Sequence, residues 1–582
     1  MKKLYITLLL CLMFTTFGYS QQDLSARDRL FDNKEEVFIH YNSTFLVAGE
    51  SLLYKLYSVD PNSGKLSNLS SIGYLELTSQ DGEQIFLHKV SLKGGAGYGD
   101  FLIPSTVPSG AYKLLGYTRW MQNAGKGHFF SGDLVIINPY MEDQSNVIWL
   151  NDSVPGSNVT TLLQDPSGGN SIRKNKKFCL EVNNDVYGRR EKVTINLSKV
   201  GSGPVRGNFS VSVKKLENFL IPQPLTAESF HSTLEDSNWE RNKNLVLPDL
   251  RGEILSGKVI ARDKNVEAGG RTLIVSLPGK PFFVRLVKTA TDGSFKLNLD
   301  KMDFGSRAFF QVLGDDREHF EIILDNAPAV EKQDIRFQEV KITNGMVELI
   351  RQRSIYNQVE NSYVSVKQDS IDSQVKSIPF YGSLPEIYNL DEFTRFPTLQ
   401  ETFVEIIQLA RVRRNRRGSS HFELTGSAGS QSLKPLLIVD GLILQDHEDF
   451  IHYDAGKVKS IGLQREKYYL GPEVFNGLMV VETINGDFYE YINHNFIKTK
   501  RIEILQPKKT YYQPVYGLKK QLYSRVPDYR LQLLWLPLLV VDGTTAEIEF
   551  YTSDVPGNYE ITIEGFTEDG EAVSLQKVIE VQ

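Results

Sequence analysis

Short segments in which apolar and polar residues alternate recur along most of the chain, and turn residues separate them. Near the N-terminus, residues 36–40 (EVFIH) and 51–57 (SLLYKLY) have the composition of strands, and Gly49-Glu50 forms a turn between them. Residues 73–77 and 110–114 continue the pattern. Strands that recur at intervals of roughly 8–12 residues are typical of a β-sandwich. The pattern therefore predicts a mainly β protein built from tandem β-sandwiches.

One region departs from this strand pattern. Residues 399–409 are expected to form a helix, since Thr398 can cap it and Glu401 supplies the capping-box partner. The apolar residues 435–439 (PLLIV) lead into Asp440-Gly441, a dipeptide that favours a tight turn with the glycine at positive φ. We therefore expect a small α/β domain here, with Asp440 and Gly441 as structural turn residues.

Composition excludes several classes of protein. The chain has 582 residues, enough for about four domains. It is 41% hydrophobic, which is sufficient for several cores and argues against a disordered chain. The formal net charge of −6 lacks the basic surplus that nucleic-acid binding usually requires. We therefore expect a globular protein with no nucleic-acid partner.

The N-terminus has the form of an export signal. Lys2 and Lys3 precede an apolar run over residues 4–17, and small residues, Gly18 and Ser20, precede a cleavage site. The run is shorter than the roughly 20 residues that a membrane span needs. We expect residues 1–20 to be a cleaved signal peptide, although a membrane anchor is the alternative. After cleavage Cys179 would be the one cysteine left, so no intramolecular disulfide is expected.

Sequence patterns of catalysis and metal binding are absent. Neither G-x-S-x-G nor H-E-x-x-H occurs, and His447 and His452 are five residues apart rather than the four that place two ligands on one helical face. The glycine-rich residues 94–99 do not follow the G-x-G-x-x-G order. We expect no catalytic residue, no cofactor, no metal site and no enzyme activity.

Three segments near the N-terminus occur in a recognisable order. A strand, a turn and a second strand over residues 37–57 precede FLIP (101–104) and PSGAYKLLGYT (108–118). This order resembles a macroglobulin domain of the alpha-2-macroglobulin superfamily, over residues 35–140. Residues 165–220 resemble a second copy. Residues 505–582 resemble a further sandwich of this type, although a type 9 secretion signal is the alternative for the tail.

The middle of the chain resembles a different sandwich. The segments ILSGKV (254–259), LIVSL (273–277) and TDGSFKL (291–297) are similar to the carboxypeptidase regulatory-like domain, here expected over residues 250–330. Residues 332–376 are charged and partly periodic. We expect them to be a connector that contains a strand and then a helix.

The α/β region carries the most specific resemblance. YNLDEFTRFPT (388–398), PLLIVDG (435–441), VKSIGL (458–463) and GLMVVET (477–483) occur in the order found in the plug domain of TonB-dependent outer-membrane receptors. Residues 378–495 therefore resemble a plug. The combination is similar to exported proteins of Bacteroidetes in which a plug-like domain accompanies macroglobulin repeats.

Two departures from these families limit what the resemblance implies. A receptor barrel needs roughly 22 strands, whereas fewer than 100 residues follow Thr483. We therefore expect a plug-like domain without its own barrel. The thioester of the superfamily needs a glutamine three residues after the cysteine, and Val182 occupies that position after Cys179. Neither import by this chain alone nor thioester chemistry is expected.

The resemblance implies a non-enzymatic interaction or scaffold protein of the bacterial outer membrane, an accessory subunit docking on a β-barrel transport, secretion or assembly machine. The expected partner is an outer-membrane β-barrel protein or its complex. The expected location is the periplasm or the cell surface, with no transmembrane helix after signal cleavage. The alternative is a glycan-binding accessory of a TonB-dependent uptake system.

Candidate partner contacts follow from residue chemistry. Five arginines occur within residues 411–417, and their guanidinium groups suit bidentate pairing with carboxylate or phosphate. Tyrosine is enriched at interface cores. A solvated hairpin is the alternative interpretation of the arginine segment. The candidate contact residues are Arg411, Arg413, Arg414, Arg416, Arg417, Tyr468 and Tyr469.

Overall fold

The computed structural model describes residues 33–150, 177–200, 204–217, 222–234, 239, 245–263, 266–300, 305–325, 335–371, 379–414, 418–426, 433–517 and 525–582. The expected signal peptide, residues 1–20, lies outside these ranges, as do the candidate contact residues Arg416 and Arg417.

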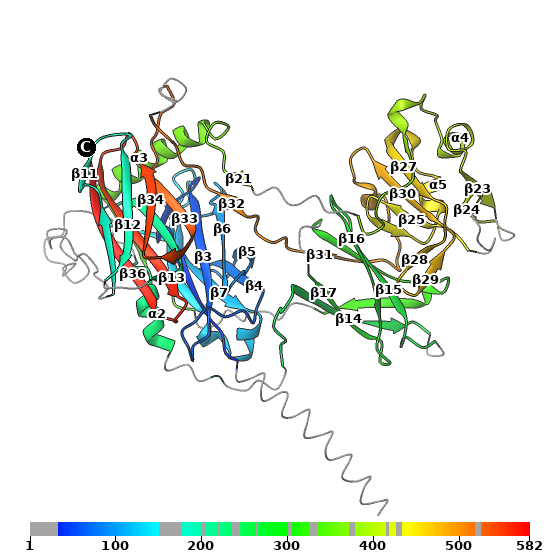
Figure 1. Ribbon diagram of the computed structural model, residues 1–582, viewed down its shortest axis with the longest axis horizontal. Helices are drawn as coiled ribbons and strands as arrows, with labels where there is room; N and C mark the ends of the chain where they lie inside the picture. The colour runs from blue at the N-terminus through cyan, green and yellow to red at the C-terminus, as the bar shows by residue number, and fades with distance from the viewer. Residues whose placement is uncertain are drawn as a thin grey trace, which may run out of the picture. The chain divides into compact units, whose positions relative to one another are not determined.

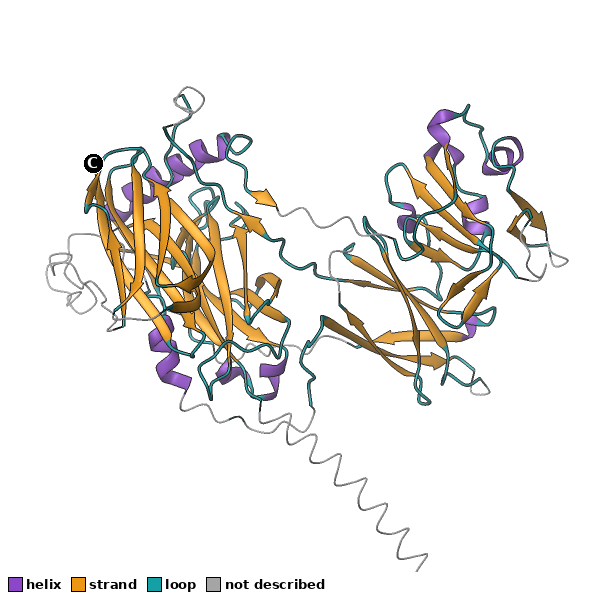
Figure 2. Cartoon of the chain, in the orientation of Figure 1, coloured by secondary structure: helices purple, strands orange, loops and turns teal. Residues whose placement is uncertain are grey.

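The chain forms two compact units, each assembled from separated segments. Unit 1 comprises Met1–Leu250, Val330–Asp372 and Gln506–Gln582, and unit 2 comprises Arg251–Ala329 and Ser373–Leu505. Strands are the main element of both units (Figures 1 and 2). The prediction of a mainly β protein is therefore confirmed.

The first sandwich of unit 1 is built from the N-terminal residues. One sheet has the order β1-β3-β6, formed by β1 (Glu36–Tyr41), β3 (Ser51–Val59) and β6 (Ala96–Leu102). The other has the order β2-β8-β7-β4-β5, formed by β2 (Phe45–Val47), β8 (Phe130–Ile137), β7 (Gly110–Thr118), β4 (Ile72–Ser79) and β5 (Gln84–Ser91). Strand β1 is buried along its whole length. This burial arises because one face of β1 packs inside the first sandwich and the other meets a second sandwich.

The second sandwich joins two segments that the sequence analysis treats as separate domains. Its sheets have the orders β10-β12-β34 and β11-β36-β35-β13-β33. The strands are β10 (Phe178–Val182), β11 (Val186–Tyr187), β12 (Lys192–Lys199), β13 (Val205–Lys215), β33 (Gln532–Gly543), β34 (Thr545–Tyr551), β35 (Gly557–Thr567) and β36 (Ala572–Val581). Strand β13 lies between β33 and β35 and pairs with both. The expectation of one sandwich over 165–220 and another over 505–582 is therefore wrong, since each segment supplies strands to both sheets.

The connector is part of unit 1. Strand β20 (Val340–Thr343) pairs in parallel with β9 (Val147–Leu150), and helix α3 (Asn344–Ser362) follows it. Strand β21 (Ser370–Ile371) pairs with β32 (Lys509–Thr510). A short helix, α2 (Ala227–Thr233), packs against β36. The expected strand and helix are thus present, and their pairing makes them structural elements of unit 1 rather than a linker.

Unit 2 contains a third sandwich. One sheet has the order β17-β14-β19, formed by β14 (Glu253–Ala261), β17 (Ser294–Leu299) and β19 (Phe320–Leu324). The other has the order β16-β15-β18-β31, formed by β15 (Thr272–Leu277), β16 (Phe283–Lys288), β18 (Arg307–Val312) and β31 (Lys498–Arg501). The sandwich expected over 250–330 therefore takes one further strand, β31, from a distant part of the chain.

The rest of unit 2, residues 379–497, is called the α/β subdomain here. Its sheet has the order β22-β27-β30-β25-β26. The strands are β22 (Glu386–Asn389), β25 (Leu436–Val439), β26 (Leu442–Leu444), β27 (Val458–Gln464) and β30 (Leu478–Thr483). Helices α4 (Leu399–Glu405) and α5 (Glu448–Ile451) accompany it, together with the hairpins β23 (Ala410–Arg414)–β24 (Ser420–Leu424) and β28 (Tyr468–Leu470)–β29 (Glu473–Phe475).

The capping box is present as predicted, because the Thr398 side chain accepts from the Glu401 N–H and the Glu401 carboxylate accepts from the Thr398 N–H. The helix ends at Glu405, earlier than the predicted Leu409, because the chain turns into β23 at Ala410. The remaining short elements are 3-10 turns at Trp120–Asn123, Lys126–His128, Arg317–His319, Leu390–Glu392, Ala455–Lys457 and Phe488–Glu490.

An apolar core joins the third sandwich to the α/β subdomain. Buried Ile274 of β15 packs with Leu436 and Ile438 of β25 and with Leu478 and Val480 of β30. Burial of apolar area stabilises such a contact by roughly 25 cal/mol per Å² removed from water. The two parts of unit 2 therefore share one core, and neither can be removed without exposing apolar surface on the other.

Candidate functional site

The Asp440-Gly441 turn joins β25 to β26. Its φ values are 49° for Asp440 and 88° for Gly441, so both residues are left-handed. A Cβ on Gly441 would lie 2.4 Å from the Cβ of Phe282, which is closer than real side chains approach. Glycine is therefore required here for two reasons, the backbone conformation and the neighbouring ring.

Asp440 has a further structural role. The Thr483 N–H donates to Asp440 Oδ1 at 2.8 Å, and the Thr483 hydroxyl donates to Oδ2 at 2.6 Å. The Phe488 N–H also donates to Oδ2, at 3.1 Å. These bonds fasten the turn to the end of β30, so the buried carboxylate holds the sheet in register rather than facing a ligand.

The arginine segment forms the β23–β24 hairpin, which is exposed. Arg411 and Arg413 share the carboxylate of Glu423, with distances of 3.1 and 2.9 Å between nitrogen and oxygen. Their side chains remain 47% and 50% exposed. Hydrogen bonding from Arg411 lowers the pKa of Glu423. Arg414 donates to the carbonyl oxygen of Gly418 at 2.8 Å, so its charge has no carboxylate partner in the described part of the hairpin.

A hollow lies beside this hairpin. Its volume is about 350 Å³, and it is lined by α4, by β23 and by the residues next to them, which are Gln400, Phe403, Val404, Gln408, Ala410, Arg411, Val412 and Thr425. Val404 is 69% exposed, whereas Phe403 is buried in the core beneath. The surface thus combines an apolar depression with arginine at its rim.

Tyr468 and Tyr469 lie on a different hairpin, β28–β29, and face different surroundings. Tyr468 packs against the core shared by the third sandwich and the α/β subdomain. Tyr469 is 64% exposed. Alternate residues of a strand point to opposite faces, so the pair does not form one contact surface. Of these two candidates, only Tyr469 is placed to meet a partner.

The remaining polar residues singled out in the sequence have structural contacts. His447 is buried, its Nδ1 accepts from the Phe422 N–H at 3.1 Å, and burial lowers its pKa to about 3. Cys179 lies on β10, and its thiol is 3.7 Å from Glu181 Oε1. Within the described ranges, no group of three or more His, Cys, Asp or Glu residues is arranged to hold a metal ion.

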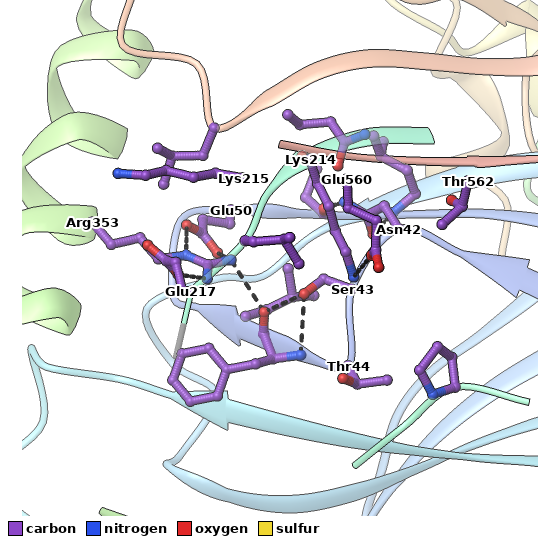
Figure 3. Close-up of a pocket in the computed structure, with 18 of the residues that line it drawn as sticks. Asn42, Ser43, Thr44, Glu50, Lys214, Lys215, Glu217, Arg353, Glu560 and Thr562 are labelled. Carbon is purple, nitrogen blue, oxygen red and sulfur yellow. Dashed lines mark hydrogen bonds and ion pairs between the residues drawn. The ribbon is translucent and has the colours of Figure 1, made fainter. Parts of the chain in front are cut away.

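Sequence reasoning did not anticipate a cavity in unit 1. It has a volume of about 430 Å³ and lies where the first and second sandwiches approach α3 (Figure 3). Its wall includes residues from β2 and β3, the end of β13, α3, and strands β35 and β36. Segments from four distant stretches of sequence therefore meet around it, and no local pattern could reveal it.

The guanidinium of Arg353 closes one side of this cavity. It donates to both carboxylate oxygens of Glu50, at 2.6 and 2.9 Å, and to Glu217 at 2.6 Å. It also donates to the Phe45 carbonyl oxygen at 3.1 Å. Arg353 on α3 thus links the first sandwich to the end of β13 through a largely buried ion-pair network (Figure 3). Such a network is costly to break on one side only.

Two lysines at the end of β13 also line the cavity. Lys214 Nζ lies 3.8 Å from Glu560 Oε2. Burial lowers the pKa of both lysines. For Lys215, which is half-buried, the Glu217 carboxylate opposes that effect by raising the pKa through a longer-range electrostatic interaction. Figure 3 shows Lys214 and Lys215 directed to different sides of the cavity.

Comparisons with known proteins give a limited result. No family model and no curated protein matches the chain. Among solved structures, it is similar to Escherichia coli alpha-2-macroglobulin in the native conformation (11% identity, TM-score 0.15) and after activation by porcine elastase (8%, 0.23). A Salmonella alpha-2-macroglobulin mutant gives 9% identity and a TM-score of 0.24.

These matches cover 94% of this chain but only 22%, 44% and 39% of the matched chains. The chain therefore spans less than half the length of the bacterial alpha-2-macroglobulins that it resembles. Because the TM-scores are below 0.5, no activity or partner follows from them. No helix among the described residues is long and apolar enough to cross a membrane.

Proposed function

We propose that this chain is an exported, non-enzymatic interaction protein of the bacterial outer membrane that docks on a β-barrel partner through its α/β subdomain. The observation that carries the proposal is the exposed β23–β24 hairpin beside the apolar hollow at Val404. Its described residues contain Arg411, Arg413 and Arg414 but one carboxylate, Glu423.

The chemistry of this surface favours an acidic partner. Arginine binds carboxylates through two parallel hydrogen bonds, and the rigid guanidinium loses little conformational freedom when it does so. An apolar side chain of the partner would fill the hollow and remove Val404 from water. The choice of a β-barrel as partner rests on the resemblance of residues 378–495 to receptor plugs.

The two histidines whose pKa values are lowered most have structural surroundings, which agrees with the proposed non-enzymatic role. His40 and His447 both have pKa values lowered to about 3 by burial. Each is held inside a core, His40 by the Ser210 hydroxyl at 2.7 Å and His447 by the Phe422 N–H. Neither histidine lines one of the two described cavities, whereas a perturbed histidine that serves catalysis would face a cleft.

A binding experiment on the full mature chain tests the proposal. The protein is incubated with detergent-solubilised outer membranes, cross-linked, and its partners are identified by mass spectrometry; affinity is then measured with the purified partner. The triple variant Arg411→Gln, Arg413→Gln and Arg414→Gln should bind at least about tenfold more weakly.

The matched control removes the same charge from the third sandwich of the same unit. Lys258, Lys288 and Lys296 are exposed, and their replacement by glutamine should leave affinity unchanged. Equal affinity of the hairpin and control variants would show that the hairpin is not the docking surface. A cross-linked partner that is not a barrel protein would overturn the choice of partner.

A further inference from the structure

The wall of the unit 1 cavity contains hydrogen-bond donors that lack acceptors in the described part of the chain, whereas each of its carboxylates already accepts a hydrogen bond or forms an ion pair. Each glutamate on its wall has a named donor. These pairs are Glu50 and Glu217 with Arg353, Glu360 with Lys367, Glu560 with Gln576, and Glu564 with Ser574. The carboxylates are therefore engaged in holding the surrounding strands and helix together.

The ammonium groups of Lys214 and Lys215, by contrast, have fewer hydrogen-bond acceptors within the described ranges than they have hydrogens to donate. Lys214 is ion-paired with Glu560, but the separation of 3.8 Å between Nζ and Oε2 is longer than an ordinary hydrogen bond, so ammonium hydrogens of Lys214 remain available to a ligand. Among the described residues, no carboxylate forms an ion pair with Lys215, since Glu217 is paired with Arg353. A further donor is Thr44, whose hydroxyl is buried on the cavity wall without a hydrogen-bond partner in the described chain.

We propose that this cavity binds a small organic anion with two charged groups, one of which accepts hydrogen bonds from Lys214 and the other from Lys215, because the two lysines line different sides of the cavity (Figure 3). The volume of about 430 Å³ lies within the range of small-molecule sites, roughly 300–1,000 Å³. Leu53, Leu531 and Tyr529 supply apolar wall for the carbon skeleton. An anion would satisfy ammonium groups that burial otherwise leaves short of partners.

Isothermal titration calorimetry on the full mature chain tests this site. The probes are citrate, L-glutamate, inorganic phosphate and glycerol phosphate, with glutamine and glycerol as neutral counterparts. At least one anion should bind with a Kd below about 1 mM, and the neutral compounds should not. The carboxylate and phosphate arms decide which oxyanion the site prefers.

Substitutions then locate the binding. Lys214→Gln and Lys215→Gln should each weaken binding at least about tenfold, whereas Lys215→Arg, which keeps the charge, should stay within about threefold of the natural protein. Lys258→Gln, in unit 2, should leave the Kd unchanged. Tryptophan fluorescence checks that unit 1 remains folded in each variant.

Three results would overturn the proposal: no probe binding at about 10 mM, neutral compounds binding as well as anions, or both lysine-to-glutamine variants binding like the natural chain. If a glutamine variant fails to fold, Lys215→Arg and a crystal soaked with the best anion still decide the outcome. This test is independent of the barrel-docking proposal.

Discussion

Each unit joins two β-rich parts, and the two joints differ in chemistry. In unit 1 the first and second sandwiches meet through buried polar groups. Lys55 Nζ donates to Asn208 Oδ1 and to the Phe209 carbonyl oxygen, and the Tyr57 hydroxyl lies 2.8 Å from the Ser210 hydroxyl. In unit 2 the joint is an apolar core flanked by hydrogen bonds between uncharged groups, such as those from Gln311 Nε2 to the Ile443 carbonyl oxygen and from Gln445 Nε2 to the Val312 carbonyl oxygen.

This difference shows what each kind of joint demands of the sequence. An apolar joint needs only hydrophobic residues of suitable size, so many sequences can form it. A buried polar joint needs a specific partner for every donor and acceptor, since an unsatisfied group costs about 1–3 kcal/mol. The joint of unit 1 should therefore be sensitive to charge and pH, and the joint of unit 2 to volume and backbone conformation.

The largest effect should come from Lys55. This residue is fully buried, and burial lowers its pKa well below the ordinary value. Lys55→Glu would place a carboxylate against two oxygen atoms that accept hydrogen bonds from the lysine, Asn208 Oδ1 and the Phe209 carbonyl oxygen. We expect unit 1 to lose more than about 4 kcal/mol of stability.

Urea unfolding followed by tryptophan fluorescence measures this loss, because Trp120, Trp149, Trp239 and Trp535 all belong to unit 1. Lys93→Glu, the same charge change at an exposed position of the first sandwich, is the control. A midpoint for Lys55→Glu equal to that of Lys93→Glu would contradict the idea of a charge-sensitive joint.

Gly441→Val should disturb the apolar joint of unit 2. The substitution forces a β-branched residue to φ 88° and drives its Cβ into Phe282 of the third sandwich. Backbone strain and displacement of the ring together should cost about 3 kcal/mol. Hydrogen exchange of peptides covering β25 and β26, read by mass spectrometry, reports this loss in unit 2.

The control variant Gly486→Val separates the cost of backbone strain from the cost of displacing Phe282. Gly486 also has positive φ, 71°, but nothing lies within 4 Å of the position of its Cβ. It should cost only the strain, about 1 kcal/mol. If hydrogen exchange in β25 and β26 increases equally in both variants, packing of Phe282 against the turn contributes nothing to the joint.

The apolar features of the fold were predictable from sequence, and the buried polar ones were not. Alternation and turn residues predicted the strands, and the capping box at Thr398 follows from two residues three positions apart. Lys55, by contrast, occupies a polar position in an alternating strand and would be expected to face water. Its partner Asn208 is 153 positions away, so only the folded structure shows that it is buried.

Contacts between residues far apart in the sequence also explain why the second sandwich was divided into two predicted domains and why the cavity was missed. Nothing in residues 178–215 indicates that their neighbours in the sheet begin at residue 532. The arginine hairpin was found because its charges are consecutive in sequence. The unit 1 cavity was missed because Lys214, Arg353 and Glu560 are drawn from three separate stretches of the chain.

Acid should weaken the joint of unit 1 through His40. The unfolded histidine has its ordinary pKa of 6.5, whereas burial lowers the pKa of native His40 to about 3. Below pH 6.5 the unfolded chain takes up a proton that the native chain does not. The contribution of His40 to the free energy of unfolding is therefore complete above pH 6.5. It decreases by about 1.4 kcal/mol per pH unit as the pH drops from 6.5 toward 3.

His40→Gln isolates this contribution, because glutamine keeps a hydrogen-bonding group near Ser210 but does not titrate. The change in unfolding free energy between pH 6.5 and 4.5 should be smaller in the variant by about 2–3 kcal/mol. Tryptophan fluorescence is a suitable probe, since the rings of His40 and Trp535 are 5.2 Å apart. Identical pH slopes would show that His40 is not a source of acid sensitivity.

The smallest effect on stability should come from the hairpin, which belongs to neither joint. Arg411, Arg413 and Arg414 are exposed, and ion pairs of exposed residues contribute about 0–1 kcal/mol. Replacing all three with glutamine should change the unfolding free energy of unit 2 by less than about 0.5 kcal/mol, because their neighbour Glu423 remains hydrated. Hydrogen exchange across β25, β27 and β30 measures this change in unfolding free energy.

A much larger loss would mean that the arginines support the subdomain itself, and weaker partner binding by the variant would then reflect unfolding rather than a lost contact. Unchanged exchange together with weaker binding would assign the hairpin to recognition.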